Sequence, residues 1–351
     1  MKRPWLIYGA YGYSGQLIAE LAAAQGLQPV LAGRDGERLG ALAAALKFEH
    51  IQLDLSETAR LAEVLQRFHL VVHCAGPFSA TSRPMLDACL ASRCSYLDIT
   101  GEISVFEAAH RRAGEAKQAG IAVCPGVGFD VIPTDSLAAK LKEALPDATH
   151  LALGFDSRSG LSPGTAKTSV EGLAMGGCVR RDGLMQRVPL AWRTRSIDFG
   201  AGEKLAMTIP WGDVATAYYS TGIPNIEVFI PASPRMVKRL KKLNLVRGLL
   251  GLGLIQSFLK ARIEQRVRGP DETARERDGT YVWGEARNAA GLTRTARLFT
   301  GNGYTVTAHG AVGIARHLLE NTVAGGYYTP SMLVGSDFVC SLPGSGTVNI
   351  T

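Results

Sequence analysis

The sequence has little that would suggest a disulfide scaffold or a metal site. Its six cysteines are scattered over 351 residues without any C-x-x-C pair, and no histidine pattern such as H-E-x-x-H occurs. In a chain of this length, such cysteines are typical of reduced thiols in a cytoplasm-like compartment. We therefore expect neither a disulfide framework nor metal ligands.

A signal peptide pattern and a long apolar run are also missing. The opening "MKRPW" is followed by only a short apolar stretch, and the most apolar segment, "LNLVRGLLGLGLIQSFL", is interrupted by one arginine and three glycines within 17 residues. Such a segment is short and charged for a membrane span. We expect a cytoplasmic protein.

Acidic residues are absent from one stretch of the chain. Between Val228 and Ile263 there is no Asp or Glu, but there are eight cations: Arg235, Lys238, Arg239, Lys241, Lys242, Arg247, Lys260 and Arg262. The formal net charge is +7, so the rest of the chain carries about 7 − 8 = −1 and the basicity is local. No RNP, zinc-finger or helix-turn-helix signature accompanies it, which argues against a nucleic-acid partner.

Two interpretations of this basic apolar segment, residues 235–268, stay open. It could be a helix or helix pair that packs on its own domain. Alternatively, it could be an amphipathic surface that meets an anionic membrane, a lipid tail or a second subunit.

Short apolar runs alternate with helical patterns over the first 125 residues or so. The expected strands are Trp5–Tyr8, Gln28–Ala32, His50–Leu53, Leu70–Cys74, Ser95–Ile99 and Ile121–Cys124. The expected helices are 14–25, 36–46, 57–67, 82–92 and 104–118. Repeated strand–helix alternation predicts an α/β fold with a doubly wound parallel sheet of Rossmann type.

The pattern changes after "PGVGFDVIPTDSLA". A helix at 134–144 and a strand at 149–155 precede a Gly- and Ser-rich region, and later alternating runs predict a mostly antiparallel sheet. "ARNAAGLTR" lies between two such runs and predicts a hairpin. We therefore expect a Rossmann domain at 1–128, joined by a C-terminal helix and tail at 305–351, and an α+β substrate or dimerisation domain at 129–304.

The first strand is followed by the glycine-rich turn "GAYGYSG". Gly9, Gly12 and Gly15 are spaced by three, one residue more than in the common G-x-G-x-x-G fingerprint. Glycines here let backbone N–H groups approach a pyrophosphate at a helix N-terminus. The residues between them, Tyr11, Tyr13 and Ser14, complete the expected cofactor loop, with the bulk of Tyr11 beside the pyrophosphate.

The second strand ends in "VLAGRD", which presents Gly33 and Arg34 where NAD-binding sites carry an acidic residue. An arginine at this point can pair with a 2′-phosphate, so we expect NADP(H). Asp35 could cap the next helix at the same time.

The remaining loops should face the reacting centre, because ligands bind outside the carboxyl ends of parallel strands. Asp54 follows the third strand, near the expected adenine. The later loops contribute Cys74, Ala75, Gly76, Pro77 and Phe78, then Asp98, Thr100, Gly101 and Glu102, then Gly126, Gly128, Phe129 and Asp130.

The motifs "GAYGYSG", "LAGR", "CAGPF", "YLDITGE" and "PGVGFDVIPTD" resemble the saccharopine dehydrogenase-like oxidoreductases. "GTAKTSVEG" and "IPWGDVATAYYSTGIPNIEVFI" are similar to the bacterial branch that includes trans-acting enoyl reductases, so the resemblance covers nearly the whole chain. It implies a Rossmann domain followed by an α+β domain, and NADP-dependent hydride transfer.

A reduction also needs a proton donor. Our best candidate for the donor is the phenol of Tyr218 or Tyr219, on an expected loop. Lys167 could bind a carboxylate or phosphate, or donate a proton, and Asp130 could orient a substrate amine. Each has a plainer interpretation: core or lid aromatics, a solvated lysine, and a helix cap. His309 is a further candidate, although a histidine packed within a helix explains it as well.

We expect an NADPH-dependent reductase of a C=C, C=N or C=O bond in an apolar, acyl-thioester or lipid-like substrate. An acyl carrier protein or an anionic membrane could meet residues 235–268, and the chain could form a homodimer. The alternatives are an amino-acid imine reductase of saccharopine type and a non-catalytic NADP-binding scaffold at a membrane surface.

Overall fold

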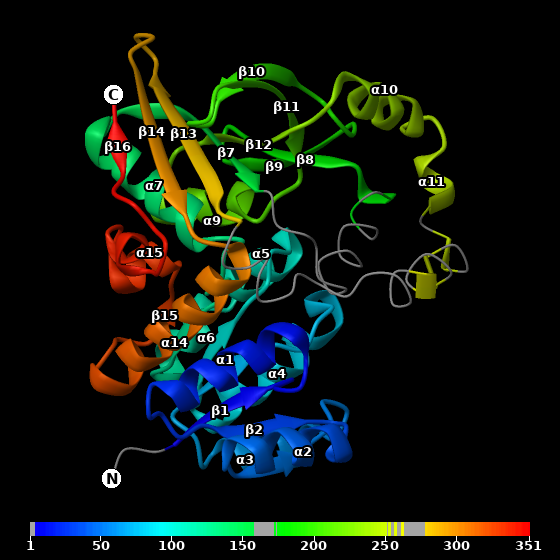
Figure 1. Cartoon of the computed structure of the whole chain (residues 1–351), viewed down its shortest axis with the longest axis vertical. Coiled ribbons are helices and arrows are strands. Elements are labelled where there is room, and N and C mark those ends of the chain that lie inside the picture. The colour runs from blue at the N-terminus through cyan, green and yellow to red at the C-terminus, as the bar shows by residue number, and fades with distance from the viewer. Residues whose placement is uncertain are drawn as a thin grey trace. The chain divides into compact units, whose positions relative to one another are not determined.

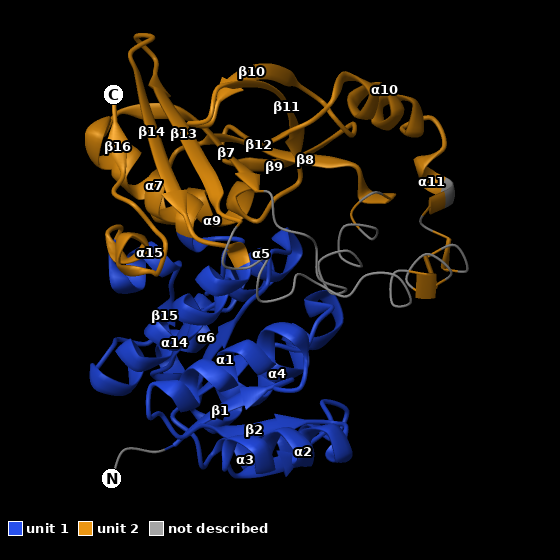
Figure 2. Cartoon of the chain, viewed as in Figure 1, with its two compact units in different colours: residues 1–132, 304–335 blue, residues 133–303, 336–351 orange. Residues whose placement is uncertain are grey.

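The computed structural model describes residues 4–157, 172, 174–250, 252–253, 256–257, 261–262 and 278–351. The chain divides into two compact units (Figure 2). Unit 1 comprises Met1–Ile132 and Tyr304–Gly335, and unit 2 comprises Pro133–Gly303 and Ser336–Thr351.

Unit 1 is built on a seven-stranded parallel sheet with the order β15-β6-β5-β4-β1-β2-β3. Its strands are β1 (Trp5–Tyr8), β2 (Val30–Gly33), β3 (His50–Gln52), β4 (Leu70–His73), β5 (Ser95–Asp98), β6 (Ala122–Cys124) and β15 (Gly326–Tyr327). Its helices are α1 (Tyr13–Ala24), α2 (Gly36–Leu46), α3 (Thr58–Leu65), α4 (Phe78–Ser92), α5 (Ile103–Arg111), α6 (Ala113–Ala119), α14 (Gly303–Glu320) and α15 (Pro330–Val334). The predicted doubly wound parallel sheet is confirmed.

The burial of the central strands explains why the strand–helix alternation can be recognised in the sequence. Every residue of β1, β2, β4 and β5 is buried. Strands that are covered on both faces appear in the sequence as continuous apolar runs, and the helices between them carry apolar residues with a period of 3.6 residues.

Two helices of unit 1 differ from the prediction. The helix expected at 104–118 is divided at Arg112, whose side chain forms ion pairs with Glu115 and Asp87. Helix α4 begins at Phe78, four residues before its predicted start.

Unit 2 contains a nine-stranded sheet in which β12 and β7 are parallel and the other neighbours are antiparallel. Its strands are β7 (Ala148–Ser157), β8 (Gly177–Arg181), β9 (Leu184–Val188), β10 (Thr194–Asp198), β11 (Glu203–Ile209), β12 (Asn225–Pro231), β13 (Thr280–Asn288), β14 (Thr293–Thr300) and β16 (Asn349–Ile350). Its helical segments are α7 (Ile132–Ala144), α9 (Asp213–Thr221), α10 (Pro234–Leu243), α11 (Arg247–Leu250) and the 3₁₀ turn η1 (Phe338–Ser341).

The mostly antiparallel second sheet agrees with the prediction. Strands β13 and β14 form the expected hairpin and lie side by side (Figure 1). One face of the sheet carries a buried cluster of Ile197, Phe199, Ala206, Phe229 and Trp283.

The end of the chain corrects the predicted domain division. The sequence pattern assigns 305–351 to the first domain, whereas residues 336–351 belong to unit 2, where β16 pairs with β14. Only residues 304–335 belong to unit 1, where β15 pairs with β6.

Within the described residues, no helix is long and apolar enough to cross a membrane.

Candidate functional site

The predicted cofactor residues all follow strands of the unit 1 sheet. Because its strands are parallel, the loops after them meet at one edge of the sheet, where ligands bind in open α/β folds. The structure therefore brings together the turn after β1, the ends of β2 and β3, and the loops after β4, β5 and β6.

The turn between β1 and α1 requires its glycines. Gly9 has φ +77°, and a Cβ there would lie 2.8 Å from the Cβ of Ala75. A Cβ on Gly15 would lie 2.3 Å from the carbonyl oxygen of Gly9. Gly12 is the N-cap of α1, which has no side-chain cap and no acidic residue in its first turn. This helix N-terminus has the donors and the dipole that hold a pyrophosphate.

Tyr11 connects the turn after β1 to the end of β2. Its ring packs over Gly33, where an added Cβ would lie 2.5 Å from ring atom Cε1. Its hydroxyl accepts a hydrogen bond from the N–H of Asp35 at 3.3 Å. The guanidinium of Arg38 lies 4.8 Å from the ring centroid and donates to the Tyr11 carbonyl at 3.2 Å. Tyr11 therefore covers the end of β2 and connects it to the turn after β1.

Asp35 caps α2, as predicted. Its Oδ1 accepts a hydrogen bond from the N–H of Arg38 at 3.1 Å. This carboxylate is therefore engaged at the helix start.

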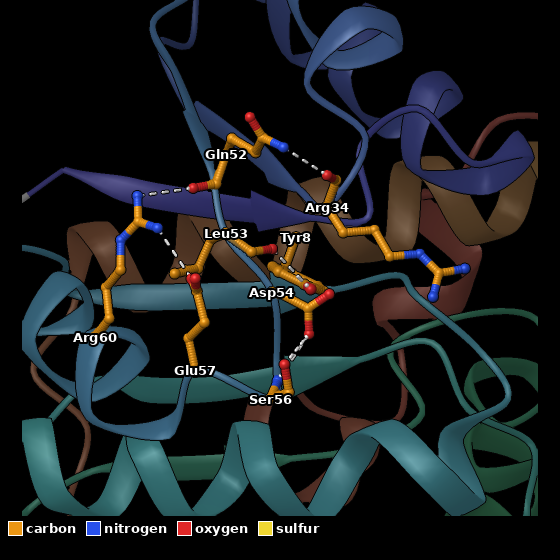
Figure 3. Close-up of polar contacts among 8 residues, drawn as sticks. All are labelled: Tyr8, Arg34, Gln52, Leu53, Asp54, Ser56, Glu57 and Arg60. Atoms are coloured by element: carbon orange, nitrogen blue, oxygen red, sulfur yellow. Dashed lines mark hydrogen bonds and ion pairs between the residues drawn. The ribbon is translucent and has the colours of Figure 1, made fainter.

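Arg34 follows β2 with an exposed side chain (Figure 3). Its carbonyl accepts a hydrogen bond from Gln52 Nε2 at 3.0 Å, and its guanidinium forms no ion pair within the described part of the chain. The nearby carboxylate of Asp54 accepts from the N–H and the hydroxyl of Ser56, at 2.8 and 2.7 Å. These two bonds, with a smaller contribution from the charge of Arg34, lower the pKa of Asp54. Arg34 thus presents an exposed cation at the end of β2.

Glu102 connects the loops after β4 and β5. Its carboxylate accepts hydrogen bonds from the N–H groups of Phe78, at 2.9 Å, and Ser79, at 2.8 Å. The Glu102 N–H in turn donates to Thr100 Oγ1 at 3.1 Å. A carboxylate at the start of α4 is favoured by the helix dipole, so Glu102 fixes where this helix begins.

Asp98, at the end of β5, extends this connection to β6. Its Oδ1 accepts from the N–H groups of Thr100 and Gly126, at 2.9 and 2.8 Å, and its Oδ2 accepts from the Tyr96 hydroxyl at 2.5 Å. Burial raises the pKa of Asp98 to about 6, although these three bonds oppose the rise. The network joins the loops that follow three neighbouring strands.

His73 is the last residue of β4, and its imidazole contacts Thr81 just after the loop that follows this strand. Burial lowers its pKa to about 3, so the imidazole is neutral at physiological pH. Thr81 Oγ1 donates to the Ala75 carbonyl at 2.6 Å, which leaves its oxygen as the acceptor for a proton on His73 Nε2, 3.1 Å away. Sequence reasoning missed His73 and Thr81.

Asp130 lies in the loop after β6. A Cβ on Gly101 would lie 2.5 Å from Asp130 Oδ2, so the two loops touch here. Burial raises the pKa of Asp130 to about 7. The preceding N–H, of Phe129, donates to Thr307 Oγ1 of α14 at 3.0 Å, a contact that the sequence did not indicate.

Two other catalytic candidates belong to unit 2. Tyr218 and Tyr219 are on helix α9 in unit 2, which corrects the expected loop; this helix ends at Gly222 with φ +70°. The buried guanidinium of Arg180 lies 4.3 Å from the Tyr218 ring centroid and 5.6 Å from that of Tyr219. Lys167 is outside the described residues.

His309 is on α14, where burial lowers its pKa. In the part of the chain that the structure describes, no group of three His, Cys, Asp or Glu side chains is arranged to hold a metal ion.

A doubly wound parallel sheet with a glycine turn at the start of its first helix, followed by a second unit on a mixed sheet, defines a two-domain protein with a dinucleotide-binding domain. Residues 5–124 match the model of the saccharopine dehydrogenase NADP binding domain. Residues 5–124 therefore belong to the saccharopine dehydrogenase-like NADP-binding family, as the motifs of this part of the chain suggested.

Similarity to curated proteins is of two kinds. The saccharopine dehydrogenase-like oxidoreductases of Mus musculus and Homo sapiens are 30% identical over 156 residues, which is 38% of this chain and 36% of each relative. The chain thus matches little more than a third of the length of these relatives. The trans-acting enoyl reductase of Mycobacterium tuberculosis is 26% identical, with 98% of this chain and 96% of that protein aligned.

Among solved structures, the chain is similar to saccharopine dehydrogenase (L-Glu forming) from Saccharomyces cerevisiae. The TM-score is 0.70 at 14% sequence identity, over 99% of this chain and all of that chain. This likeness supports the fold of both units.

Proposed function

We propose that this chain is an NADPH-dependent reductase of an apolar substrate, an acyl thioester or similar lipid-like molecule, in which a C=C, C=N or C=O bond is reduced. The observation that carries the proposal is the alignment with a trans-acting enoyl reductase over nearly the whole of both chains. The NADP-binding family of residues 5–124 supports redox chemistry with a nicotinamide cofactor.

The end of β2 favours NADP over NAD. The strand ends at Gly33, and the only acidic side chain that follows directly, Asp35, caps α2. Arg34 and Arg38 are exposed cations on either side of that cap, with the Tyr11 hydroxyl beside them. Two guanidinium groups and a phenol fit a 2′-phosphate, whereas a ribose hydroxyl would need an acceptor.

The chemistry also fits the loops after β5 and β6. NADPH supplies the hydride when it is bound, and a proton must come from the protein or from solvent. Burial raises the pKa of Asp130 to about 7, and its carboxyl lies against Gly101 in the loop after β5, so we infer that Asp130 can hold a proton near neutral pH and act as the donor. Tyr218, Tyr219 and Lys167 are the alternatives that substitution would test.

Replacement of Arg34 tests the cofactor assignment. Arg34→Ala should weaken NADPH binding about tenfold to a hundredfold, because a hydrogen bond to a charged group contributes about 1.5–3 kcal/mol. NADH binding should change little. Arg67→Ala, an exposed cation beyond the far end of α3, is the matched control and should bind NADPH normally. Equal NADPH affinity of the two variants would show that the phosphate lies elsewhere.

Stopped-flow oxidation of NADPH tests the reaction. Enoyl thioesters of increasing chain length should be reduced, with higher kcat/KM for longer chains. Faster turnover of imino acids with two carboxylates would instead assign a saccharopine-type reaction. Tight NADPH binding without turnover of either class would contradict a catalytic role and favour the scaffold.

A further inference from the structure

Helix α10 carries an unusual concentration of positive charge. Five of its ten residues are cations, namely Arg235, Lys238, Arg239, Lys241 and Lys242. All five side chains are exposed, and none of them forms an ion pair with a carboxylate in the part of the chain that the structure describes. Unpaired like charges on one helix repel one another, so this arrangement has a cost unless an anion is bound.

The helix is nevertheless firmly part of unit 2. Val237 is buried in a cluster with Met207 of β11, and Leu240 packs against the same cluster. Ser233 caps the helix start, where its Oγ accepts from the N–H of Met236 at 3.2 Å. At the other end, Asn244 exchanges two hydrogen bonds with the backbone of Leu190. The packed-helix interpretation of this part of the segment is therefore correct, and it leaves the charged side of α10 facing outward.

An open groove runs along that charged side. Its volume is about 490 Å³, within the roughly 300–1,000 Å³ of pockets that take small ligands. Its lining is mostly apolar and is formed by Thr194, Leu205, Pro234, Val237 and Leu245 together with Lys238, Lys241 and Lys242. A mostly apolar groove that includes three lysines suits an anionic amphiphile.

Large apolar side chains of α10 and of the residues that follow it are exposed, and one of them, Leu245, lines the groove. Met236 is 49% exposed, Leu245 88%, Val246 49% and Leu252 54%. Leu245 has the highest exposure of any large hydrophobic side chain in the described chain. Exposed leucines and valines beside unpaired lysines are typical of helices that lie in a membrane interface.

We propose that the α10 surface, defined as the five cations of α10 together with Met236, Leu245 and Val246, docks this protein on an anionic lipid bilayer. The cations match the negative potential of a membrane that contains acidic phospholipids, and the exposed apolar groups enter the boundary between headgroups and acyl chains. A nucleic acid would satisfy the cations but would leave Leu245 and Val246 without an apolar partner. The inference is independent of the proposed reductase activity.

Vesicle flotation of the full chain tests this proposal without any substrate. Vesicles of phosphatidylcholine alone should bind the protein weakly. Vesicles that also contain phosphatidylserine should bind it strongly, and binding should fall as salt is raised.

The paired variant Lys238→Glu/Lys241→Glu should lower the partition coefficient on phosphatidylserine vesicles at least about tenfold. The control Lys47→Glu/Lys117→Glu changes two exposed lysines of unit 1 and the net charge by the same amount, and it should bind almost as well as the parent chain. Leu245→Ser keeps every charge and should lower binding about threefold to tenfold through lost apolar insertion. Thermal melting and NADPH titration show whether each variant is folded.

Three results would overturn the proposal. The first is equal loss in the two lysine pairs, which would mean diffuse attraction by net charge. The second is unaltered binding of Leu245→Ser, which would mean adsorption without insertion. The third is indifference of the parent chain to phosphatidylserine vesicles; capture of an acidic protein in their place would assign the surface to a protein partner. None of these results bears on NADPH oxidation, so the reductase proposal stands or fails separately.

Discussion

Removal of the Glu102 carboxylate should destabilise unit 1 and loosen the loop that precedes α4. The half-buried side chain accepts two backbone hydrogen bonds, at 2.9 and 2.8 Å, from N–H groups that have no partner within the helix. Each such bond contributes about 1 kcal/mol net of hydration. Glu102→Ala should therefore lower the free energy of unfolding by about 2 kcal/mol, and Glu102→Gln, which keeps one acceptor oxygen, by about 1 kcal/mol.

Thermal melting followed by circular dichroism measures the effect. For a domain of this size, 1 kcal/mol shifts Tm by about 2–4 °C, so Glu102→Ala should melt about 4–8 °C lower. Glu37 is a matched control because it lies in the first turn of α2 with an exposed side chain that forms no hydrogen bond or ion pair among the described residues. Glu37→Gln loses only its interaction with the helix dipole, about 0.3–1 kcal/mol.

NADPH titration separates a local effect from a general one. The hydrogen bonds of Glu102 hold the loop Cys74–Pro77, so Glu102→Ala should weaken cofactor binding as well as melting, whereas Glu37→Gln should leave binding unchanged. If Glu102→Ala melts within about 1 °C of Glu37→Gln, the two bonds contribute nothing net and the reasoning from geometry is wrong.

Two further predictions concern the same edge of the sheet. Gly15→Ala should lower the free energy of unfolding by about 1–3 kcal/mol and abolish NADPH binding, because the new Cβ would lie 2.3 Å from the Gly9 carbonyl oxygen. The control is Gly114→Ala on α6, where the new Cβ would meet open space, so it should leave the stability unchanged or raise it by up to about 1 kcal/mol. Urea unfolding of the two variants measures the difference. Asp130 has a folded pKa of about 7 against an ordinary value of about 3.9, so its contribution to stability is full below about pH 4 and is lost as pH rises through 7. Asp130→Asn should flatten the pH dependence of the unfolding free energy over that range, and an unchanged slope would contradict the burial of this carboxyl.

The sequence predicted unit 1 well because its elements are locally determined. Strands such as Leu70–His73 are buried throughout, and helices such as Gly36–Leu46 have their own cap and apolar stripe. Once the alternation is recognised, parallel topology forces the loops to one edge, so most cofactor candidates could be placed there without any contact being known.

Features that depend on distant residues were not predictable in the same way. Helix α4 begins at Phe78 because of a carboxylate 24 residues later, and no local signal marks that start. Strands β15 and β16 have two residues each, too few for a pattern. The hairpin of β8 and β9 was missed for another reason: its Asp182-Gly183 turn, with φ +48° and +78°, is a strong signal that the prediction did not use.

In unit 2, the sequence and the expected topology do not locate a site. The mixed sheet does not bring the loops after its strands to one shared edge, because most of its neighbouring strands run in opposite directions. Tyr218 and Tyr219 were chosen for their chemistry alone, and the structure shows them packed around Arg180. Residue types that can carry out chemistry identify a site only where the topology of the fold also brings them together.

The polar network under the cofactor loops suggests a signal that sequence reasoning can use. Tyr8, His73 and Asp98 are each the last residue of a fully buried strand, and the register pairs Tyr8 with His73 and His73 with Asp98. In parallel strands with aligned ends, the last residues form one row across the sheet. Burial in that row makes the imidazole neutral and raises the pKa of the Asp98 carboxyl, so these residues shape the loops above them. When neighbouring parallel strands each end in a polar residue, the sequence therefore predicts that these residues form a buried row next to the loops that bind the ligand.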